Sequence, residues 1–351
     1  MTSSLWAFTW ACLIAVAPVE SPVKEFAVGE PLPVPAGAHV FVESDRKEYF
    51  LGENVLLHLG VENVGAAPFD VTRGGDYRNS GGRELRFLVR AVDAEGKECD
   101  DPTPDAYALC MGGIMVTSSI EPNATSYMSI PLLEYRRIEK PGTYRIFVSH
   151  DLGWLGMPTK PVPIAEITLS FKQPSAAEAK QLVEQMVNAE RKRNWSFDGK
   201  KEPAYTAFSL LRDPIYLPEL LKLMAAKSKH AIEGISGIST PAATEALIRA
   251  AGDDDPEFAL LAAKSLLERL PPPPPRDPKF EELFNEMFPG SRERQQEYVA
   301  EVWRPEFAPE VRRLADKLQL SKNPEVVACG NDLRQRVDPK PPAGKPSPND
   351  K

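Results

Sequence analysis

The feature that most constrains this chain is a change in the spacing of its apolar residues near residue 173. Before that point apolar and polar residues alternate in short runs, as over 55–61, which is the period of a β-strand. After it apolar residues recur every three to four positions, as from Leu182 to Val187, which is the period of a helix face. The change predicts a β-domain over 38–172 and a helical domain over 175–338.

Composition limits the kinds of partner that such a chain takes. The 351 residues are 42% hydrophobic and 26% charged, which is typical of globular domains and, at this length, of about two of them. The formal net charge is −8, from 42 basic and 50 acidic residues, whereas a nucleic-acid-binding protein needs a basic face. We therefore expect no nucleic acid among the partners.

The N-terminus has the pattern of a targeting segment. Residues 5–17 are an unbroken run of apolar or small residues, too short to span a bilayer as a helix, and Ala15 to Ala17 form an A-x-A cleavage pattern. We expect a signal peptide at 1–17 and a proline-rich linker at 18–37. The chain is then exported to the periplasm or outside the cell. If the segment is not cleaved, it would be the one contact with a membrane.

Two stretches of the β-domain carry a family resemblance. Residues 50–71 (FLGENVLLHLGVENVGAAPFDV) and 140–148 (KPGTYRIFV) resemble paired strands of bacterial immunoglobulin-like domains. The stretches are also similar to strands of proteinase-inhibitor sandwiches. The resemblance implies an antiparallel β-sandwich with Tyr144 at a tyrosine corner. Further strands are expected at 40–42, 85–92, 126–132 and 164–171, and the strand at 55–61 is expected to be half-buried.

Two loops of the β-domain carry the candidate functional residues. In an exported protein, Cys99 and Cys110 are expected to form a disulfide within one Asp- and Pro-rich loop. A calcium site on that loop is the alternative, but it lacks the spacing of a known calcium motif, so we predict no metal. The loop over 73–83 combines glycine, arginine and tyrosine, which are typical of contact surfaces. Its candidate partner-contact residues are Arg73, Asp76, Tyr77, Arg78 and Arg83.

The helical domain shows repeated helix starts. Ser175 and Glu178 form a capping box, and an N-cap residue directly before proline recurs along the domain. These dipeptides are Asp213-Pro214, Thr240-Pro241, Asp255-Pro256, Asp277-Pro278 and Asn323-Pro324. Helix pairs follow them, and 255–267 and 323–334 resemble the second helix of bacterial HEAT-like repeats. The resemblance implies a short α-solenoid.

The predicted solenoid is interrupted and ends before the C-terminus. An insertion is expected at 271–304, because it begins with five prolines, and a disordered tail at 339–351. Leucines at the helical period should supply the core shared by the repeats, and Arg249 and Lys264 should face water. The expected core residues are Leu220, Leu221, Ala246, Leu247, Ile248, Leu260, Leu261, Leu266 and Leu267.

No catalytic motif appears in the sequence. The four histidines have no metal-ligand spacing, and 234–238 falls short of G-x-S-x-G because Ile238 replaces the last glycine. We therefore predict no catalytic, cofactor-binding or metal-binding residues and no cofactor. The expected function is a non-enzymatic exported interaction or scaffolding protein with a protein partner of unknown identity. The alternatives are an inhibitor or regulator of a secreted hydrolase acting through a sandwich loop, and an enzyme with a site between the domains.

Overall fold

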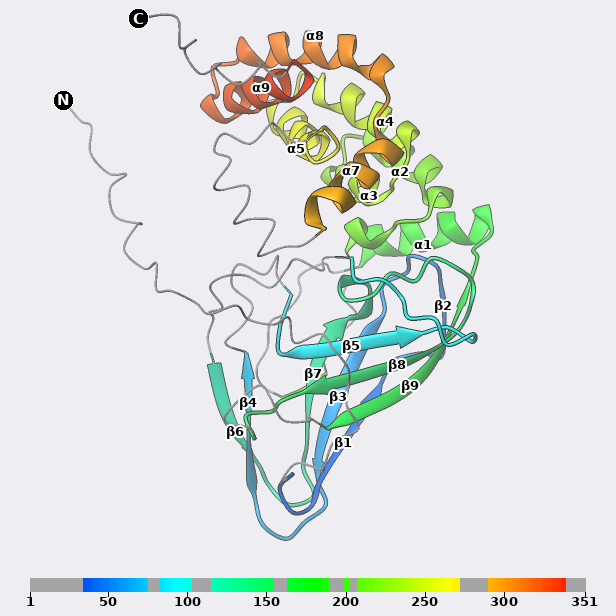
Figure 1. The fold of residues 1–351 in the computed structure, drawn as a ribbon, viewed down its shortest axis with the longest axis vertical. Helices are drawn as coiled ribbons and strands as arrows, with labels where there is room; N and C mark the ends of the chain where they lie inside the picture. Colours follow the sequence, from blue (N-terminus) through cyan, green and yellow to red (C-terminus); the bar gives the residue numbers. More distant parts are fainter. Residues whose placement is uncertain are drawn as a thin grey trace, which may run out of the picture.

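The chain has a β-sheet half followed by a helical half (Figure 1). The computed structural model describes residues 34–74, 83–102, 115–154, 163–189, 199–201, 207–271 and 290–338. The predicted signal peptide, most of the predicted linker and the predicted tail lie outside these residues. Within them, no helix is long and apolar enough to cross a membrane.

The β-half contributes three sheets to the described part of the chain. Its strands are β1 (Ala38–Glu43), β2 (Glu48–Phe50), β3 (Leu56–Asn63), β4 (Phe69–Gly74), β5 (Phe87–Val92), β6 (Met115–Ile120), β7 (Thr125–Pro131), β8 (Gly142–His150) and β9 (Ile164–Lys172). The strand orders are β1-β3-β7, β2-β9-β8-β5 and β4-β6, and every pair is antiparallel except β2 with β9. Strands predicted at β1, β3, β5, β7, β8 and β9 are confirmed, whereas β2, β4 and β6 were not predicted.

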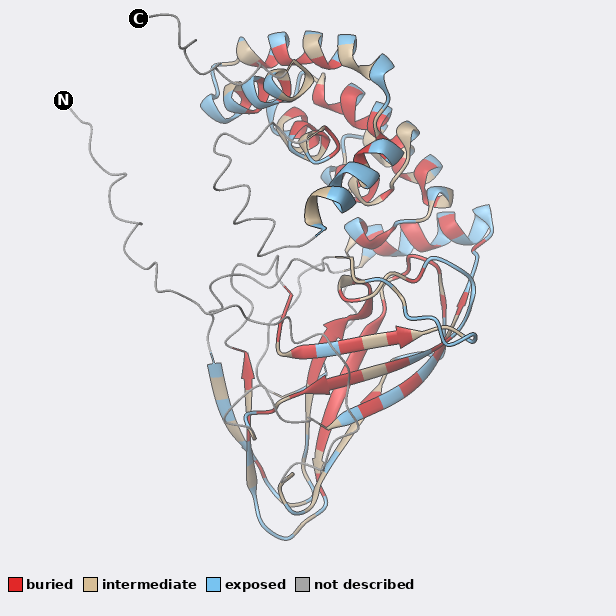
Figure 2. Cartoon of the chain, viewed as in Figure 1, coloured by how far each residue is buried: buried red, intermediate tan, exposed pale blue. Residues whose placement is uncertain are grey.

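The two larger sheets share one apolar core. Leu57 and Leu59 of β3 are fully buried and pack in one cluster with Ile146 of β8 and Leu169 of β9. Figure 2 shows this buried layer running through both sheets. Alternate side chains of each strand therefore face the other sheet, as the period of two requires.

The expectation that the third strand is half-buried is wrong. Leu56 and His58, on the face opposite to the shared core, are only 5% and 1% exposed. β3 lies between β1 and β7, and the Phe41 ring of β1 lies so close over Gly60 that a Cβ there would collide with it. The second face of this central strand is therefore covered as well. The alternation of residues within the strand cannot predict this, because the cover comes from a neighbouring strand.

The helical half consists of short, capped helices. They are α1 (Ala176–Asn188), α2 (Leu217–Ala225), α3 (Lys229–Gly237), α4 (Pro241–Ala251), α5 (Pro256–Leu267), α7 (Ser291–Val302), α8 (Ala308–Gln319) and α9 (Pro324–Val337). The predicted capping box of Ser175 and Glu178 is confirmed, and the side chains of Thr240, Asp255 and Asn323 cap α4, α5 and α9. Asp213 caps the 3-10 turn η3 (Pro214–Tyr216), and Asp277 lies outside the described residues.

Three helix pairs stack side by side in this half. The pairs are α2 with α3, α4 with α5, and α8 with α9, and α4 also contacts α2 and α8 while α5 contacts α3 and α9. At one end of the stack α1 packs against α2 and η3, and α9 lies at the other end (Figure 1). α7, inside the predicted insertion, packs against α4, where the Thr244 hydroxyl donates to the carbonyl oxygen of Val302 at 2.9 Å.

The predicted core of the helical half is correct in part. Leu220, Ala246, Leu247, Ile248 and Leu266 are buried, but Leu221, Leu260, Leu261 and Leu267 are only partly buried. The core side of α5 is instead lined by Phe258, Ala262, Ala263 and Leu266. Since nine of the twelve residues of α5 are apolar or alanine, its period alone does not distinguish the faces. The predicted exposure of Arg249 and Lys264 is confirmed.

The turn over residues 51–54 joins the two halves. The Tyr216 hydroxyl of η3 donates to the Leu51 carbonyl oxygen at 2.7 Å, and burial raises the pKa of this hydroxyl. The Asn54 side chain makes two hydrogen bonds with the backbone of Ala207, one of 2.8 Å from the Ala207 N–H and one of 3.2 Å to its oxygen. Leu210, from the 3-10 turn η2 (Phe208–Leu210), belongs to the core of the β-half.

A second segment beyond α1 also returns to the β-half. The Gly199 carbonyl oxygen accepts a 2.7 Å hydrogen bond from the Tyr127 N–H at the open edge of β7. The Lys201 ammonium lies 4.9 Å from the centre of the Tyr127 ring and pairs with Glu43 of β1. The sequence position at which the hydrophobic period changes is therefore not a boundary between the packed structures.

Candidate functional site

The predicted contact loop begins later than expected. Arg73 lies in β4, is only 4% exposed, and donates hydrogen bonds to the hydroxyls of Ser118 and Ser126. Arg83 is 8% exposed. Asp76, Tyr77 and Arg78 lie outside the described residues. The two described arginines are thus engaged within the β-half, at the two stems of the loop.

Arg83 ties its loop to the next connection along the chain. Its guanidinium donates to both carboxylate oxygens of Asp101, at 2.7 and 2.9 Å, and stacks over the Tyr135 ring at 4.6 Å. The Tyr135 hydroxyl in turn donates to the Glu84 carbonyl oxygen at 2.9 Å. A bidentate, largely buried arginine–carboxylate pair fixes both orientation and distance. The residues just after loop 75–82 and just before segment 103–114 are therefore held together.

Arg86 ties both stems of the same loop to a third connection. Its guanidinium donates to the Gly74 carbonyl oxygen at 2.8 Å, to that of Thr72 at 3.2 Å, and to the Asp151 carboxylate through Nε at 3.0 and 3.1 Å. Burial opposes the charge of Asp151, but the hydrogen bonds from Arg86 and from the Gly153 N–H, together with nearby positive charge, outweigh burial and lower the pKa of this carboxyl. Asp151 follows β8 directly, so the stem of the β8–β9 connection joins the same assembly.

His150 reinforces this assembly without offering acid–base chemistry. The Leu152 N–H donates to its Nδ1 at 2.9 Å, so the neutral ring carries its proton on Nε2, which is buried and has no hydrogen-bond partner among the described residues. Burial, helped by the charge of Arg86, lowers the pKa of His150 to about 3. The ring is 1% exposed and lies 4.7 Å from that of Phe87. It is a neutral, packed side chain at physiological pH.

These contacts define what we call the stem clamp, formed by Arg83, Arg86, Asp101 and Asp151. It lies at one end of the β-half, beside the tip of β4 and the start of β5 (Figure 1). It joins the stems of three connections, β4–β5, β5–β6 and β8–β9. Sequence reasoning identified Arg83 as a candidate contact residue but did not assign the other three residues to such an assembly. The sequence did contain one signal for the clamp, since the charged residue Arg86 stands within the otherwise mostly apolar run 85–92.

A second cluster contains the residue types of a catalytic triad. The Ser129 hydroxyl lies 2.7 Å from His58 Nδ1, and the Asp45 carboxylate lies 3.4 Å from His58 Nε2. Burial lowers the pKa of His58, so the ring is neutral near pH 7. Ser129 and His58 are only 5% and 1% exposed, so both side chains are buried within the sheet rather than presented to a substrate. The cluster instead links β3 to β7, because His58 and Ser129 are cross-strand partners.

The structure does not test the predicted disulfide. Cys99 carries a half-buried thiol whose pKa is raised by burial to about 11, and Cys110 lies outside the described residues. The disulfide therefore stays a prediction. Within the described ranges, no group of three or more His, Cys, Asp or Glu side chains is placed to hold a metal ion.

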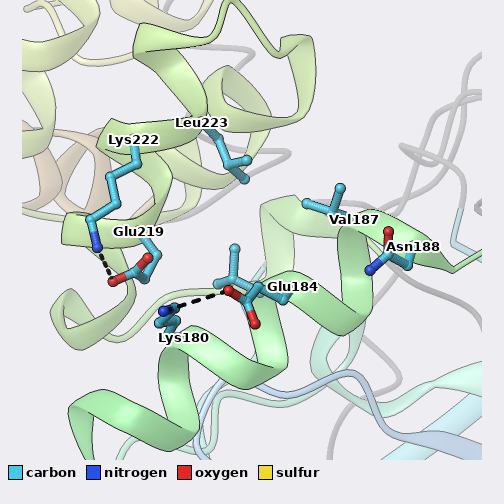
Figure 3. A pocket seen from close by; sticks show the side chains of 8 residues that line it. Lys180, Glu184, Val187, Asn188, Glu219, Lys222 and Leu223 are labelled. Atoms are coloured by element: carbon cyan, nitrogen blue, oxygen red, sulfur yellow. Dashed lines mark hydrogen bonds and ion pairs between the residues drawn. The ribbon is translucent and has the colours of Figure 1, made fainter.

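The described part of the helical half includes two open grooves. The first, the α1–α2 groove, has a volume of about 320 Å³ and is lined by residues such as Lys180, Glu184, Glu219, Lys222 and Leu223 (Figure 3). The second, the α4–α8 groove, has a volume of about 330 Å³ and is lined by Ile248, Arg249, Gly252, Glu310, Arg313, Leu314 and Lys317. Both lie at the low end of the range in which proteins bind small ligands or single side chains.

Comparison with protein-family models found no match, and neither did comparison with curated proteins. Among solved structures, the CARDB domain of the PF1109 protein from Pyrococcus furiosus is similar over 40% of this chain and 99% of that one, at 12% identity and TM-score 0.21. A β-glucosidase from Listeria innocua matches over 38% and 16% at 10% identity and TM-score 0.20. The alkylpurine DNA glycosylase AlkC from Pseudomonas fluorescens matches over 38% and 31% at 15% identity and TM-score 0.19. Likenesses this slight assign neither a family nor an activity.

Proposed function

We propose that this chain is a non-enzymatic, exported interaction or scaffolding protein that binds a protein partner through the connections whose stems the stem clamp joins. The clamp is the observation that carries the proposal. Two arginines and two carboxylates, with both guanidiniums mostly buried, join three connections. Buried ion pairs are a poor source of stability but a good means of fixing geometry. Binding residues are often placed on loops held by a rigid scaffold.

The composition of the clamped loop supports the same proposal. Residues 75–82 (GDYRNSGG) contain Asp76, Tyr77 and Arg78 among small and polar residues. Tyrosine and arginine are enriched in protein interfaces, because each offers a large contact area together with hydrogen bonds. A fixed stem lowers the entropy that such a loop loses on binding.

We further propose that the β-half is an immunoglobulin-like sandwich and the helical half a short HEAT-like solenoid. The shared core of the two larger sheets supports the first assignment. The Tyr144 hydroxyl donates to the Lys140 carbonyl oxygen at 2.8 Å, a bond of the kind found in a tyrosine corner. The stack of three helix pairs, in which first helices contact first helices and second contact second, supports the solenoid.

The proposal is tested by site-specific photo-crosslinking in the producing cell. A photoreactive amino acid replaces Tyr77 in one variant and Val64, which is 63% exposed but remote from the clamp, in the control. We expect one discrete crosslinked protein from position 77 and none from position 64. The combined substitutions Asp76→Ala and Arg78→Ala should abolish that crosslink and leave the far-ultraviolet circular dichroism unchanged. The same products from both positions, or none from position 77, would contradict the proposal.

Two companion measurements address export and the alternatives. The intact mass of the mature chain, measured by mass spectrometry, should correspond to removal of residues 1–17. If the captured partner is a secreted hydrolase whose activity falls when this chain is added, the inhibitor alternative replaces the scaffolding one. At the junction between the halves, the 51–54 turn forms hydrogen bonds with Tyr216 and Ala207, and an enzyme with an interdomain site stays an alternative.

A further inference from the structure

Two arginines, one from each half of the molecule, lie at the edge of one shared core. Arg137 directly precedes Ile138, which packs in the core of the β-half. Arg212 lies two residues after Leu210, which packs in the same core although it belongs to η2. The junction between the halves therefore brings two positive charges toward each other.

A third arginine, Arg269, packs against the segment that carries Arg212. A Cβ on Gly237 would lie only 3.2 Å from the carbonyl oxygen of Leu211, the residue before Arg212. Arg269 donates to the carbonyl oxygens of the two residues that flank Gly237, at 2.9 and 2.8 Å. Its charge is thus held by backbone dipoles, and burial lowers its pKa.

Tyr298 of α7 adds a hydroxyl to this group. Arg269 donates to the Thr244 hydroxyl at 3.1 Å, which donates to the Val302 carbonyl oxygen at 2.9 Å. Tyr298 lies four residues before Val302, on the same side of α7. Burial raises the pKa of Tyr298, although the charges of Arg269 and Arg212 act in the opposite direction. The hydroxyl therefore stays protonated and can donate a hydrogen bond.

These four residues, Arg137, Arg212, Arg269 and Tyr298, are called the junction cluster below. Among the described residues, the side chains of Arg137 and Arg212 make no hydrogen bond or ion pair, and Arg137 Nε is buried.

The carboxylates around the junction cluster do not neutralise it. Glu139, Glu268 and Glu301 act on the cluster through space, but among the described residues they form no ion pair with it. Burial and the charge of Arg137 lower the pKa of Arg212, and the opposing charge of Glu139 does not reverse this. The positive charge of Arg212 is therefore uncompensated.

Solvent reaches the junction cluster. Arg212 is exposed, even though burial is the main cause of its lowered pKa. Water thus touches a guanidinium that protein atoms largely surround. Arg137 and Tyr298 are partly exposed as well. A small ion can therefore approach hydrogen-bond donors that come from three separate segments of the chain.

We propose that the junction cluster binds a small, doubly charged oxyanion of the phosphate class, held by the guanidiniums of Arg137 and Arg212 and by the hydroxyl of Tyr298. Two guanidiniums supply two charges and the forked donors that match such an ion. Arg269 is fully buried, so it contributes charge without touching the ligand. The ion would bridge the two halves, and this inference goes beyond the function proposed for the clamped connections.

The test measures the thermal unfolding midpoint of the full-length chain by circular dichroism, with inorganic phosphate added against chloride at the same ionic strength. A ligand of the folded chain raises the midpoint with its concentration, which gives the affinity. We expect phosphate to raise the midpoint. Arg137→Gln and Arg212→Gln should each weaken the affinity by about tenfold or more, because each removes a charged donor. In chloride, neither substitution should lower the midpoint, because no carboxylate pairs with the charge that is removed.

Phenyl phosphate, added in the same way, distinguishes the two sources of such an ion. Tighter binding than that of inorganic phosphate would assign the site to a phosphate monoester of a larger molecule, and weaker binding would assign it to the free ion. Either result supports the site, whereas no response to both ligands would overturn it.

Arg313→Gln is the matched control, since it removes the same charge from an exposed arginine of α8. It should keep the native response, which separates binding from the general stabilisation that phosphate produces by exclusion from protein surfaces. An equal phosphate response in the native chain and all three variants would overturn the proposal. A lower midpoint of Arg212→Gln in chloride would also overturn it, because the arginine would then have a structural partner. Arg212→Gln should leave the crosslink from position 77 intact, so the two proposals can fail separately.

Discussion

The β-half and the helical half differ in the sequence range of the contacts that stabilise each of them. In the β-half, the buried polar bonds join segments far apart in sequence, as between Arg86 and Asp151 or between His58 and Ser129. In the helical half, most packing is between consecutive helices of a pair or between adjacent pairs. The comparison teaches that local patterns suffice to specify the helical half, whereas the β-half depends on pairings that appear only in the folded chain.

Arg269 is the largest exception to this contrast, and removing it should have the largest effect. It follows α5, is fully buried, and donates to the carbonyl oxygens of Ile235, Ser236 and Ile238 at 2.8 to 2.9 Å, at the end of α3. Arg269→Met would remove one charged donor from each of these oxygens, although those of Ile235 and Ile238 keep a backbone N–H donor, from Ile238 and Thr240. We expect the free energy of unfolding to fall by about 3–5 kcal/mol, as measured by urea denaturation followed by circular dichroism.

The exposed Lys264 of α5 supplies the control for that variant. Lys264→Met should cost less than about 0.5 kcal/mol. If Arg269→Met lowers the free energy of unfolding no more than Lys264→Met does, the helical half does not depend on the long-range hydrogen bonds of Arg269. The contrast between the halves would then be greater than the structure indicates.

The pH dependence of stability should come chiefly from the β-half. The pKa of His150 is about 3 in the folded chain against 6.5 for an ordinary histidine. Between these pH values the unfolded chain binds the proton and the folded chain does not, so stability decreases as the pH falls below 6.5. The decrease approaches about 1.4 kcal/mol per pH unit for one such group.

His150→Asn tests this source of pH dependence. Asparagine offers an oxygen that can accept the Leu152 N–H but does not titrate. The urea midpoint should therefore fall less between pH 7 and pH 5 in the variant than in the native chain. His58, whose pKa burial also lowers, should account for part of the remaining slope. An unchanged slope in His150→Asn would show that the ring is not kept neutral by folding.

The same contrast explains what the sequence could predict. The N-caps at Thr240, Asp255 and Asn323 and the pairing of the helices follow from signals within a few residues. The short strand β2 was missed, because its three residues show no period and pair in parallel with β9 at the far end of the domain. β4 and β6 were missed because they pair with each other although β5 lies between them in the sequence.

The candidate sites divide in the same way. Arg83 could be selected by its place in a glycine-rich loop, but its partner Asp101 could not, because no local pattern indicates a cross-loop ion pair. The α4–α8 groove could not be predicted either, since its two helices are separated by the insertion between α5 and α8. For the same reason, the change of hydrophobic period near residue 173 located the change of secondary structure but not the packing of Leu210 into the β-core.

From the hydrogen bonds of the 51–54 turn with Tyr216 and Ala207, we expect the two halves to unfold as one cooperative unit, and this is the central claim to test. Native-state hydrogen exchange with mass spectrometry tests it most directly, because it reports the opening free energy of β3, β8, α4 and α5 separately. The account predicts one common opening free energy for the slowest amides of both halves. Asn54→Ala, which removes two hydrogen bonds to Ala207, should lower that value by about 1–2 kcal/mol in both. Two different opening free energies in the native chain, with only one of them changed by Asn54→Ala, would contradict the claim.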